Sequence, residues 1–226
     1  MGRTETFARV KEAGIIPALR TSNQDDAVKA TEAIRVGGIV VVEISLGPKN
    51  ALDVLAAVAA AQANSMLIGA GTVVDAEGVR QAALAGAQFI VTPGFSAEAT
   101  AKAKEFGLAI FAGALTPTEV QIASANGVDA VKLFPCFAAG ETRYLRTLRG
   151  QYPQTDFIAS GGGGLDNCFD YIRAGTCAIG VGAEIADFDS MLAGDYPVFT
   201  VRARRLRQPV KAARALLHSG SSKLLD

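Results

Sequence analysis

The sequence predicts an α/β fold, and three observations agree on it. Short apolar runs rich in Val and Ile alternate along the chain with Ala-rich stretches of helical periodicity. The runs begin 20 to 28 residues apart, the length of one strand, one helix and two short loops. Val and Ile fall on both faces of the runs, as in parallel strands that are covered on both sides. Eight such units in 226 residues predict one (β/α)8 barrel.

Eight runs carry the strand pattern. They are Ile15–Leu19, Ile39–Ser45, Leu67–Ala70, Gln88–Thr92, Leu108–Ala112, Val128–Phe134, Asp156–Ser160 and Thr176–Val181. A doubly wound open sheet is the alternative arrangement of the same elements. No Gly-x-Gly-x-x-Gly segment follows the first run, which favours the barrel.

The helices between these runs are marked by their ends. Residues that favour N-caps stand where five helices are expected to begin: Asp25, Asp75, Ser96, Thr116 and Asp166. Glycines that can adopt the left-handed conformation follow four expected helix ends: Gly86, Gly107, Gly127 and Gly175. Each of these glycines stands just before the next apolar run, so the pattern repeats around the chain.

One domain is expected over residues 1–226, because no Pro-, Gly- or Ser-rich linker divides the chain. Residues 195–218 are expected to form a C-terminal helix that closes the barrel bottom or one edge. Its basic residues are expected to face solvent: Arg202, Arg204, Arg205 and Arg207. Residues 219–226 are expected to form a loose tail.

Composition and charge exclude several classes of function. The 22 basic residues balance the 22 acidic ones, aromatic residues make up 7% and Trp is absent, so no nucleic-acid partner is expected. The apolar runs are interrupted well short of the ~18 residues that span a bilayer, so no membrane partner is expected either. The first residues have no apolar core typical of a secretory signal.

The cysteines and the single histidine argue against disulfides and metal sites. The chain has three cysteines, Cys136, Cys168 and Cys177, and no Cys-x-x-Cys pair. An odd number of unpaired cysteines is typical of a protein in a reducing compartment and predicts a cytoplasmic location. His218 lies near the C-terminus, and no cluster of metal-ligating residues accompanies it. We therefore expect no metal and no cofactor.

Charged residues are rare in the apolar runs, so the exceptions carry information. Glu43 alternates with Val42 and Ile44, and Lys132 alternates with Val131 and Leu133. Because the apolar neighbours suit the helix layer, Glu43 and Lys132 are expected to point into the barrel. Both stand toward the carboxyl ends of their runs, where barrel active sites lie. Asp129 and Asp156 begin their runs and are expected to lie at the opposite end.

A lysine inside an apolar barrel suggests covalent catalysis. The walls remove solvation from the Lys132 amine and favour its neutral form, which can attack a carbonyl and form a Schiff base. Glu43 can then move protons, directly or through water. A buried structural ion pair is the alternative interpretation of the same two residues.

Four segments resemble one known family. They are Val42–Leu46, Gly69–Val73, Val91–Gly94 and Val131–Pro135, and the resemblance runs from about Gly14 to Ala186. The family comprises the 2-keto-3-deoxy-6-phosphogluconate and 4-hydroxy-2-oxoglutarate aldolases, with a 6-phosphogalactonate branch. It implies a class I aldolase that cleaves a 2-keto-3-deoxy sugar acid, expected to carry a 6-phosphate, into pyruvate and glyceraldehyde 3-phosphate or glyoxylate. It also implies a homotrimer.

The resemblance implies a role for each matching residue. Lys132 matches the Schiff-base lysine and Glu43 the general acid/base. Thr72 matches the threonine that binds the pyruvate carboxylate, and Arg20 lies in a segment similar to one that carries a substrate-binding arginine. Pro93 and Phe134 match apolar walls around the pyruvyl group, and three glycines match those at the phosphate end of the substrate: Gly161, Gly162 and Gly182. Ser160 and Ala183 stand in the same two loops and are also expected to contact the substrate. Loops after the seventh and eighth strands of a barrel often bind phosphate, which agrees with the glycines.

Two departures from the family pattern concern anion binding. Gly47 and Pro48 stand where phosphogluconate enzymes have an arginine, and Ala183 stands where a phosphate-binding serine is usual, with Glu184 beside it. Two other functions stay open on the residues alone. One is a barrel isomerase or synthase that acts on a sugar phosphate without an imine, and the other is a barrel that senses a small acid.

Overall fold

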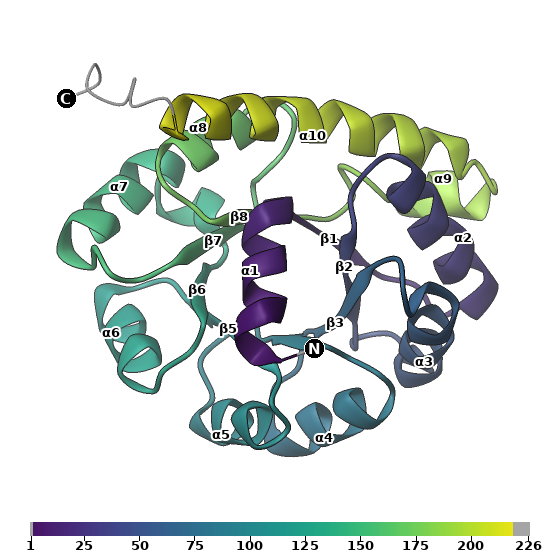
Figure 1. The fold of residues 1–226 in the computed structure, drawn as a ribbon, viewed down its shortest axis with the longest axis horizontal. Helices are drawn as coiled ribbons and strands as arrows, with labels where there is room; N and C mark the ends of the chain where they lie inside the picture. The colour runs from purple at the N-terminus through teal and green to yellow at the C-terminus, as the bar shows by residue number, and fades with distance from the viewer. Residues whose placement is uncertain (1, 219–226) are drawn as a thin grey trace.

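Eight parallel strands close into a barrel in chain order, with β8 paired to β1, in the computed structural model, which describes residues 2–218 (Figure 1). The predicted (β/α)8 barrel is confirmed. The strands are β1 (Ile15–Leu19), β2 (Val41–Ser45), β3 (Leu67–Gly71), β4 (Phe89–Val91), β5 (Ala109–Ala114), β6 (Ala130–Leu133), β7 (Phe157–Ser160) and β8 (Ala178–Val181).

One helix, α1 (Arg3–Ala13), precedes the first strand, and the other helical segments follow the strands in the outer layer. They are α2 (Gln24–Val36), α3 (Ala51–Gln62), α4 (Ala76–Leu84), α5 (Ala97–Glu105), α6 (Pro117–Ala125), the 3₁₀ turn η1 (Cys136–Ala139), α7 (Glu141–Gln151), α8 (Cys168–Arg173), α9 (Phe188–Leu192) and α10 (Pro197–His218). No helix within residues 2–218 is both long enough and apolar enough to cross a membrane.

Three of the five predicted N-caps are confirmed. The side chains of Asp75, Ser96 and Thr116 accept hydrogen bonds from the first turns of α4, α5 and α6. The prediction that Asp25 is an N-cap is wrong. Asn23 caps α2, and Asp25 lies in the first turn, where its negative charge interacts favourably with the helix dipole. Asp166 is also wrong, because α8 begins one residue later, after Asn167.

The four glycines expected after helix ends all have positive φ, between 68° and 98°. They are Gly86, Gly107, Gly127 and Gly175. An L side chain is disfavoured in this conformation, so these positions end their helices and redirect the chain toward the next strand.

Helix α1, which the strand pattern did not predict, closes the bottom of the barrel (Figure 1). Val10 belongs to the interior apolar cluster, and the ring of Phe7 lies 5.6 Å from that of Phe111. Arg3 pairs with Asp129, and Lys11 pairs with Asp156. The two aspartates therefore lie at the amino ends of their strands, as predicted, and serve to hold α1.

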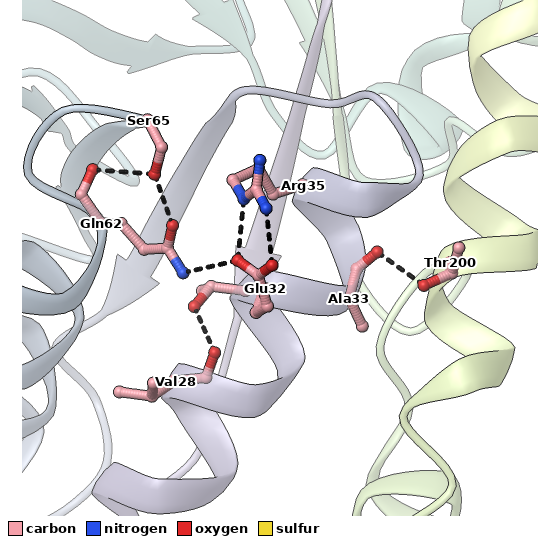
Figure 2. Close-up of polar contacts among 8 residues, drawn as sticks. Val28, Glu32, Ala33, Arg35, Gln62, Ser65 and Thr200 are labelled. Carbon is pink, nitrogen blue, oxygen red and sulfur yellow. Dashed lines mark hydrogen bonds and ion pairs between the residues drawn. The ribbon is translucent and has the colours of Figure 1, made fainter.

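Helix α10 covers an outer edge of the barrel rather than its bottom, and lies against α2 and α8 (Figure 1). It begins at Pro197, two residues after the expected start. Thr200 donates a hydrogen bond of 2.8 Å to the carbonyl of Ala33 in α2 (Figure 2). Arg202 pairs with Asp187, so the expectation that it faces solvent is wrong. The tail expected over 219–226 lies outside the described residues.

Side chains on α2 also form hydrogen bonds with the neighbouring helix α3. Glu32 accepts two hydrogen bonds, of 2.6 and 2.7 Å, from Arg35, and a third from Gln62 of α3 at 3.3 Å (Figure 2). Ser65 donates to the Gln62 side chain at 2.6 Å. Neighbouring helices are thus joined by polar contacts outside the apolar layer that separates them from the strands.

Successive side chains along a strand belong to two different apolar clusters, one inside the barrel and one between the strands and the helices. On β2, Val41 joins the interior cluster, while Val42 and Ile44 join the outer one. On β6, Ala130 lies inside, while Val131 and Leu133 lie outside. Glu43 and Lys132 therefore point into the barrel, as the alternation predicts.

Candidate active site

One cavity of about 440 Å³ opens at the carboxyl end of the barrel and brings all eleven predicted site residues together. They are Arg20, Glu43, Thr72, Pro93, Lys132, Phe134, Ser160, Gly161, Gly162, Gly182 and Ala183. A second hollow of about 510 Å³ lies beside it between the loops that follow β2 and β3. Its acidic side chains are exposed, so the first cavity is the better candidate for chemistry.

Lys132 lies in the wall of this cavity on β6 and is only 9% exposed. Its Nζ atom lies 4.7 Å from the centre of the Phe134 ring. The face of an aromatic ring attracts a cation, but it is not a strong hydrogen-bond acceptor for the amine. Gly113 stands opposite Lys132 on β5, and a β-carbon there would overlap the backbone of Pro93. The missing side chain lets the loop after β4 pack against β5, and Pro93 of this loop lines the same cavity as the lysine.

Glu43 is 7% exposed and faces the same cavity from β2. A β-carbon at Gly71 would overlap its carboxylate, so glycine provides the space that the carboxylate occupies. Burial raises the pKa of Glu43 above its ordinary value, and the charges of Lys132 and Arg20 counteract this in part. In the described part of the chain Glu43 and Lys132 form no direct ion pair, which leaves both groups available to a substrate.

Thr72 follows β3 in an unusual conformation. Its φ is 59°, which a β-branched residue rarely adopts. Its hydroxyl lies 2.9 Å from the hydroxyl of Ser45, which is 1% exposed at the end of β2. The contact with Ser45 therefore fixes where the Thr72 hydroxyl lies at the cavity rim.

The glycine loop after β7 forms the far end of the cavity and is held in place from behind. Gly161 and Gly162 have φ values of 70° and 117°. The carbonyl of Gly161 accepts hydrogen bonds from the Cys136 thiol and the Phe137 amide, each at 3.0 Å. Burial raises the pKa of Cys136, which keeps the thiol protonated as a donor. Asn167 donates to the carbonyl of Gly162.

The loop after β8 faces this glycine loop. Gly180 leaves space for the Ser160 hydroxyl, because a β-carbon there would lie 2.7 Å from it. Ala183 and Glu184 are exposed, and the N–H of Gly182 donates to the Glu184 carboxylate at 2.8 Å. Arg20 is exposed at the rim, just after β1.

Sequence reasoning did not assign roles to Ser45, Gly71 or Gly113. Ser45 shares the inward face with Glu43 two residues earlier, so the alternation alone could have indicated it. Gly71 and Gly113 give no such signal in the sequence. Each leaves space for a residue that is distant in the sequence, and this need becomes visible only in the folded structure. Within residues 2–218, no group of three or more His, Cys, Asp or Glu side chains is placed to hold a metal ion.

The family model described as "Aldolase: KDPG and KHG aldolase" matches residues 7–201. The 2-dehydro-3-deoxy-phosphogluconate aldolase of Treponema pallidum is 31% identical over 204 residues, which cover 90% of this chain and 97% of the relative. The KHG/KDPG aldolase of Escherichia coli K12 is 28% identical and covers 87% of this chain and 92% of its own.

Solved structures agree with these relatives. A KDPG aldolase from Legionella pneumophila, with pyruvate captured as a covalent carbinolamine intermediate, superposes with a TM-score of 0.84 at 25% identity. The match covers 89% of this chain and 97% of that one. A 3-hexulose-6-phosphate synthase reaches a TM-score of 0.69 at 17% identity over 87% of this chain and 99% of that one, a likeness of fold alone.

Proposed function

Because the chain belongs to the KDPG and KHG aldolase family, as its four motifs predict, we propose that its cavity cleaves 2-keto-3-deoxy sugar acids to pyruvate and an aldehyde. The chain is a class I aldolase, and the candidate substrates are the phosphogluconate derivative named for its relatives and the same acid without its phosphate, with glyceraldehyde 3-phosphate or glyceraldehyde as the second product. The observation that carries the proposal is a buried Lys132 in an apolar wall with an unpaired carboxylate facing the same cavity.

The proposed reaction begins at Lys132. Its neutral amine adds to the C2 carbonyl of the keto acid, and the carbinolamine loses water to give a protonated imine. The imine is the electron sink when the C3–C4 bond breaks. The electron pair moves into the resulting enamine, C3 then gains a proton, and water hydrolyses the imine to release pyruvate and the free lysine.

Glu43 is the proposed proton carrier of this sequence. As the C3–C4 bond breaks, the C4 hydroxyl must lose a proton for the aldehyde to form, and the Glu43 carboxylate can accept it, directly or through water. Its raised pKa suits this task, because a carboxyl that binds a proton more firmly than usual is a stronger base when ionised. The same proton can later be delivered to C3 or to the departing hydroxyl of the carbinolamine.

Substrate positioning is proposed for the other lining residues. Thr72 would donate to the keto-acid carboxylate, with Arg20 supplying a positive charge at the rim in place of the arginine missing at Gly47 and Pro48. Pro93 and Phe134 would pack against the pyruvyl group. Ser160, Gly161, Gly162, Gly182 and Ala183 would face the far end of the sugar acid.

The proposal is tested by two measurements on the purified protein. We expect the protein to release pyruvate from 2-dehydro-3-deoxy-6-phosphogluconate or from its unphosphorylated analogue. The rate of release is measured by coupling pyruvate formation to lactate dehydrogenase. We also expect pyruvate with sodium borohydride to add one reduced pyruvyl group, mapped to Lys132 by peptide mass spectrometry. Absence of both pyruvate release and the adduct would exclude a class I aldolase acting on these acids.

Replacing Ser45 with alanine should raise KM for the keto acid about 5- to 10-fold, the cost of losing one hydrogen bond of ~1 kcal/mol, while kcat changes little. The reason is that Thr72 loses the partner that fixes its hydroxyl. Ser45→Thr keeps a hydroxyl and is expected to restore KM. A fall in kcat with unchanged KM would contradict a role through Thr72.

A homotrimer in the cytoplasm is the proposed state of the protein. A designed protein cage, described as made by fusing symmetric oligomeric domains, matches 92% of this chain and 78% of its own with 30% identity and a TM-score of 0.78, which supports an oligomer. Light scattering on the purified protein should give three times the mass of one chain. A monomeric mass would contradict the proposal.

A further inference from the structure

Glu184 accepts a hydrogen bond from a backbone N–H group at the far end of the cavity. The Gly182 N–H, at the end of β8, points its hydrogen to Oε2 of Glu184 at 2.8 Å. Backbone donors in this loop are the groups that hold phosphate in barrels of this kind. The chain thus fills with its own carboxylate a position that an anionic substrate end would require.

The Glu184 side chain also reaches across to the opposite loop. A β-carbon at Gly164 would lie 3.4 Å from Cγ of Glu184, so the stem of the side chain passes over the loop that follows β7. This loop is held from behind by Asn167, which donates to Gly162 and accepts from the Gly164 amide at 2.9 Å. The space between the two loops is therefore bounded by a carboxylate and by a backbone that is fixed in place.

Glu184 shares the cavity with Arg20 but forms no salt bridge with it. Within residues 2–218, no lysine or arginine forms an ion pair with it. Ala183 beside it offers no hydroxyl donor. A phosphate entering this space would meet an unpaired carboxylate and one donor fewer, whereas a hydroxyl group could donate to the same carboxylate. Repulsion of one ligand and attraction of the other is how a site discriminates between them.

We infer that Glu184 is a specificity-determining residue that selects sugar acids with an uncharged, hydroxylated far end over those that end in phosphate. The inference rests on the proposed aldolase function and names the substrate class of that same site. In the wild-type protein, kcat/KM for 2-dehydro-3-deoxygluconate should equal or exceed kcat/KM for its 6-phosphate.

The test compares these two substrates in three variants. Glu184→Gln keeps the shape and removes the charge, and Glu184→Ala removes both. Each should shift the ratio of kcat/KM values at least 10-fold toward the phosphorylated acid. The matched control, Glu98→Gln, removes an exposed acid from the outer helix α5 and should leave the ratio within 2-fold of wild type.

Several results would overturn the inference. They are a wild-type preference for the phosphate of 10-fold or more, ratios unchanged in both Glu184 variants, or a shift in Glu184→Ala alone, which would exclude the charge as the cause. Pyruvate lacks the far end of the sugar acid, so borohydride trapping at Lys132 should be unaffected in every variant. Trapping that persists while the ratios disagree contradicts only the role of Glu184. Absence of both trapping and cleavage contradicts the aldolase function itself.

Discussion

Replacing Lys132 with methionine is expected to lower kcat/KM by ~10⁴-fold or more, since the proposed covalent nucleophile is lost and the thioether of methionine cannot form an imine. Methionine has nearly the length of lysine and suits the apolar wall formed with Phe134. The variant should therefore fold and still bind a keto acid. The measurement is pyruvate release, together with the intact mass after treatment with pyruvate and borohydride.

The control for this experiment is Lys102→Met, which removes a partly exposed lysine from the outer helix α5 and a surface ion pair of small energetic value. It should retain the activity and the adduct of the wild-type protein. An adduct of normal yield in Lys132→Met, or activity above about 1% of wild type, would assign the imine to another lysine.

Replacing Glu43 with glutamine should lower kcat by about 10²- to 10⁴-fold, the usual contribution of a general acid/base, with a smaller effect on KM. The amide has the same shape and fits the space beside Gly71, so the expected loss comes from proton transfer. The measurement is the steady-state rate of pyruvate release, with circular dichroism to show that the variant is folded. A loss confined to KM would indicate that Glu43 binds substrate without moving protons.

The pH dependence of Glu43 has a definite sign. Burial raises the pKa of this carboxyl, so its proton is released at higher pH than from an exposed glutamate, whose pKa is about 4.3. In the proposed mechanism, cleavage of the C3–C4 bond needs the ionised form of Glu43. The wild-type kcat should therefore fall as pH is lowered through the raised pKa, and this acid limb should lie above the range of an exposed glutamate. Glu43→Gln should lack the limb, and a limb that persists would belong to another group.

The barrel and the inward placement of Glu43 and Lys132 follow from local sequence patterns. Val42 and Ile44 place Glu43 inward, and Val131 and Leu133 do the same for Lys132, because adjacent residues of a strand face opposite sides. Eight repeats of this arrangement then bring the two groups to one end of one barrel. Nothing beyond short-range periodicity and the handedness of parallel connections is needed for these conclusions.

Other features depend on contacts that no local pattern describes. The positive φ of Thr72 opposes the preference of threonine and is visible only in the folded chain. The charge of Glu184 is evident from the sequence, yet its bond to Gly182 depends on a side-chain rotamer. Helix α1 offers only a narrow apolar stripe, and its partner Phe111 is more than a hundred residues away along the chain.

The order in which α1 and its partners are synthesised has a consequence for folding. This helix is synthesised before its partners, and its ion pairs join residues 126 and 145 positions apart, Arg3 with Asp129 and Lys11 with Asp156. A nascent chain therefore carries an unmatched apolar face until most of the barrel has been made. Contacts of such long range slow folding and expose apolar surface to other chains meanwhile. The helix that covers the bottom of the barrel is therefore made before its partners and can dock only after they have been synthesised.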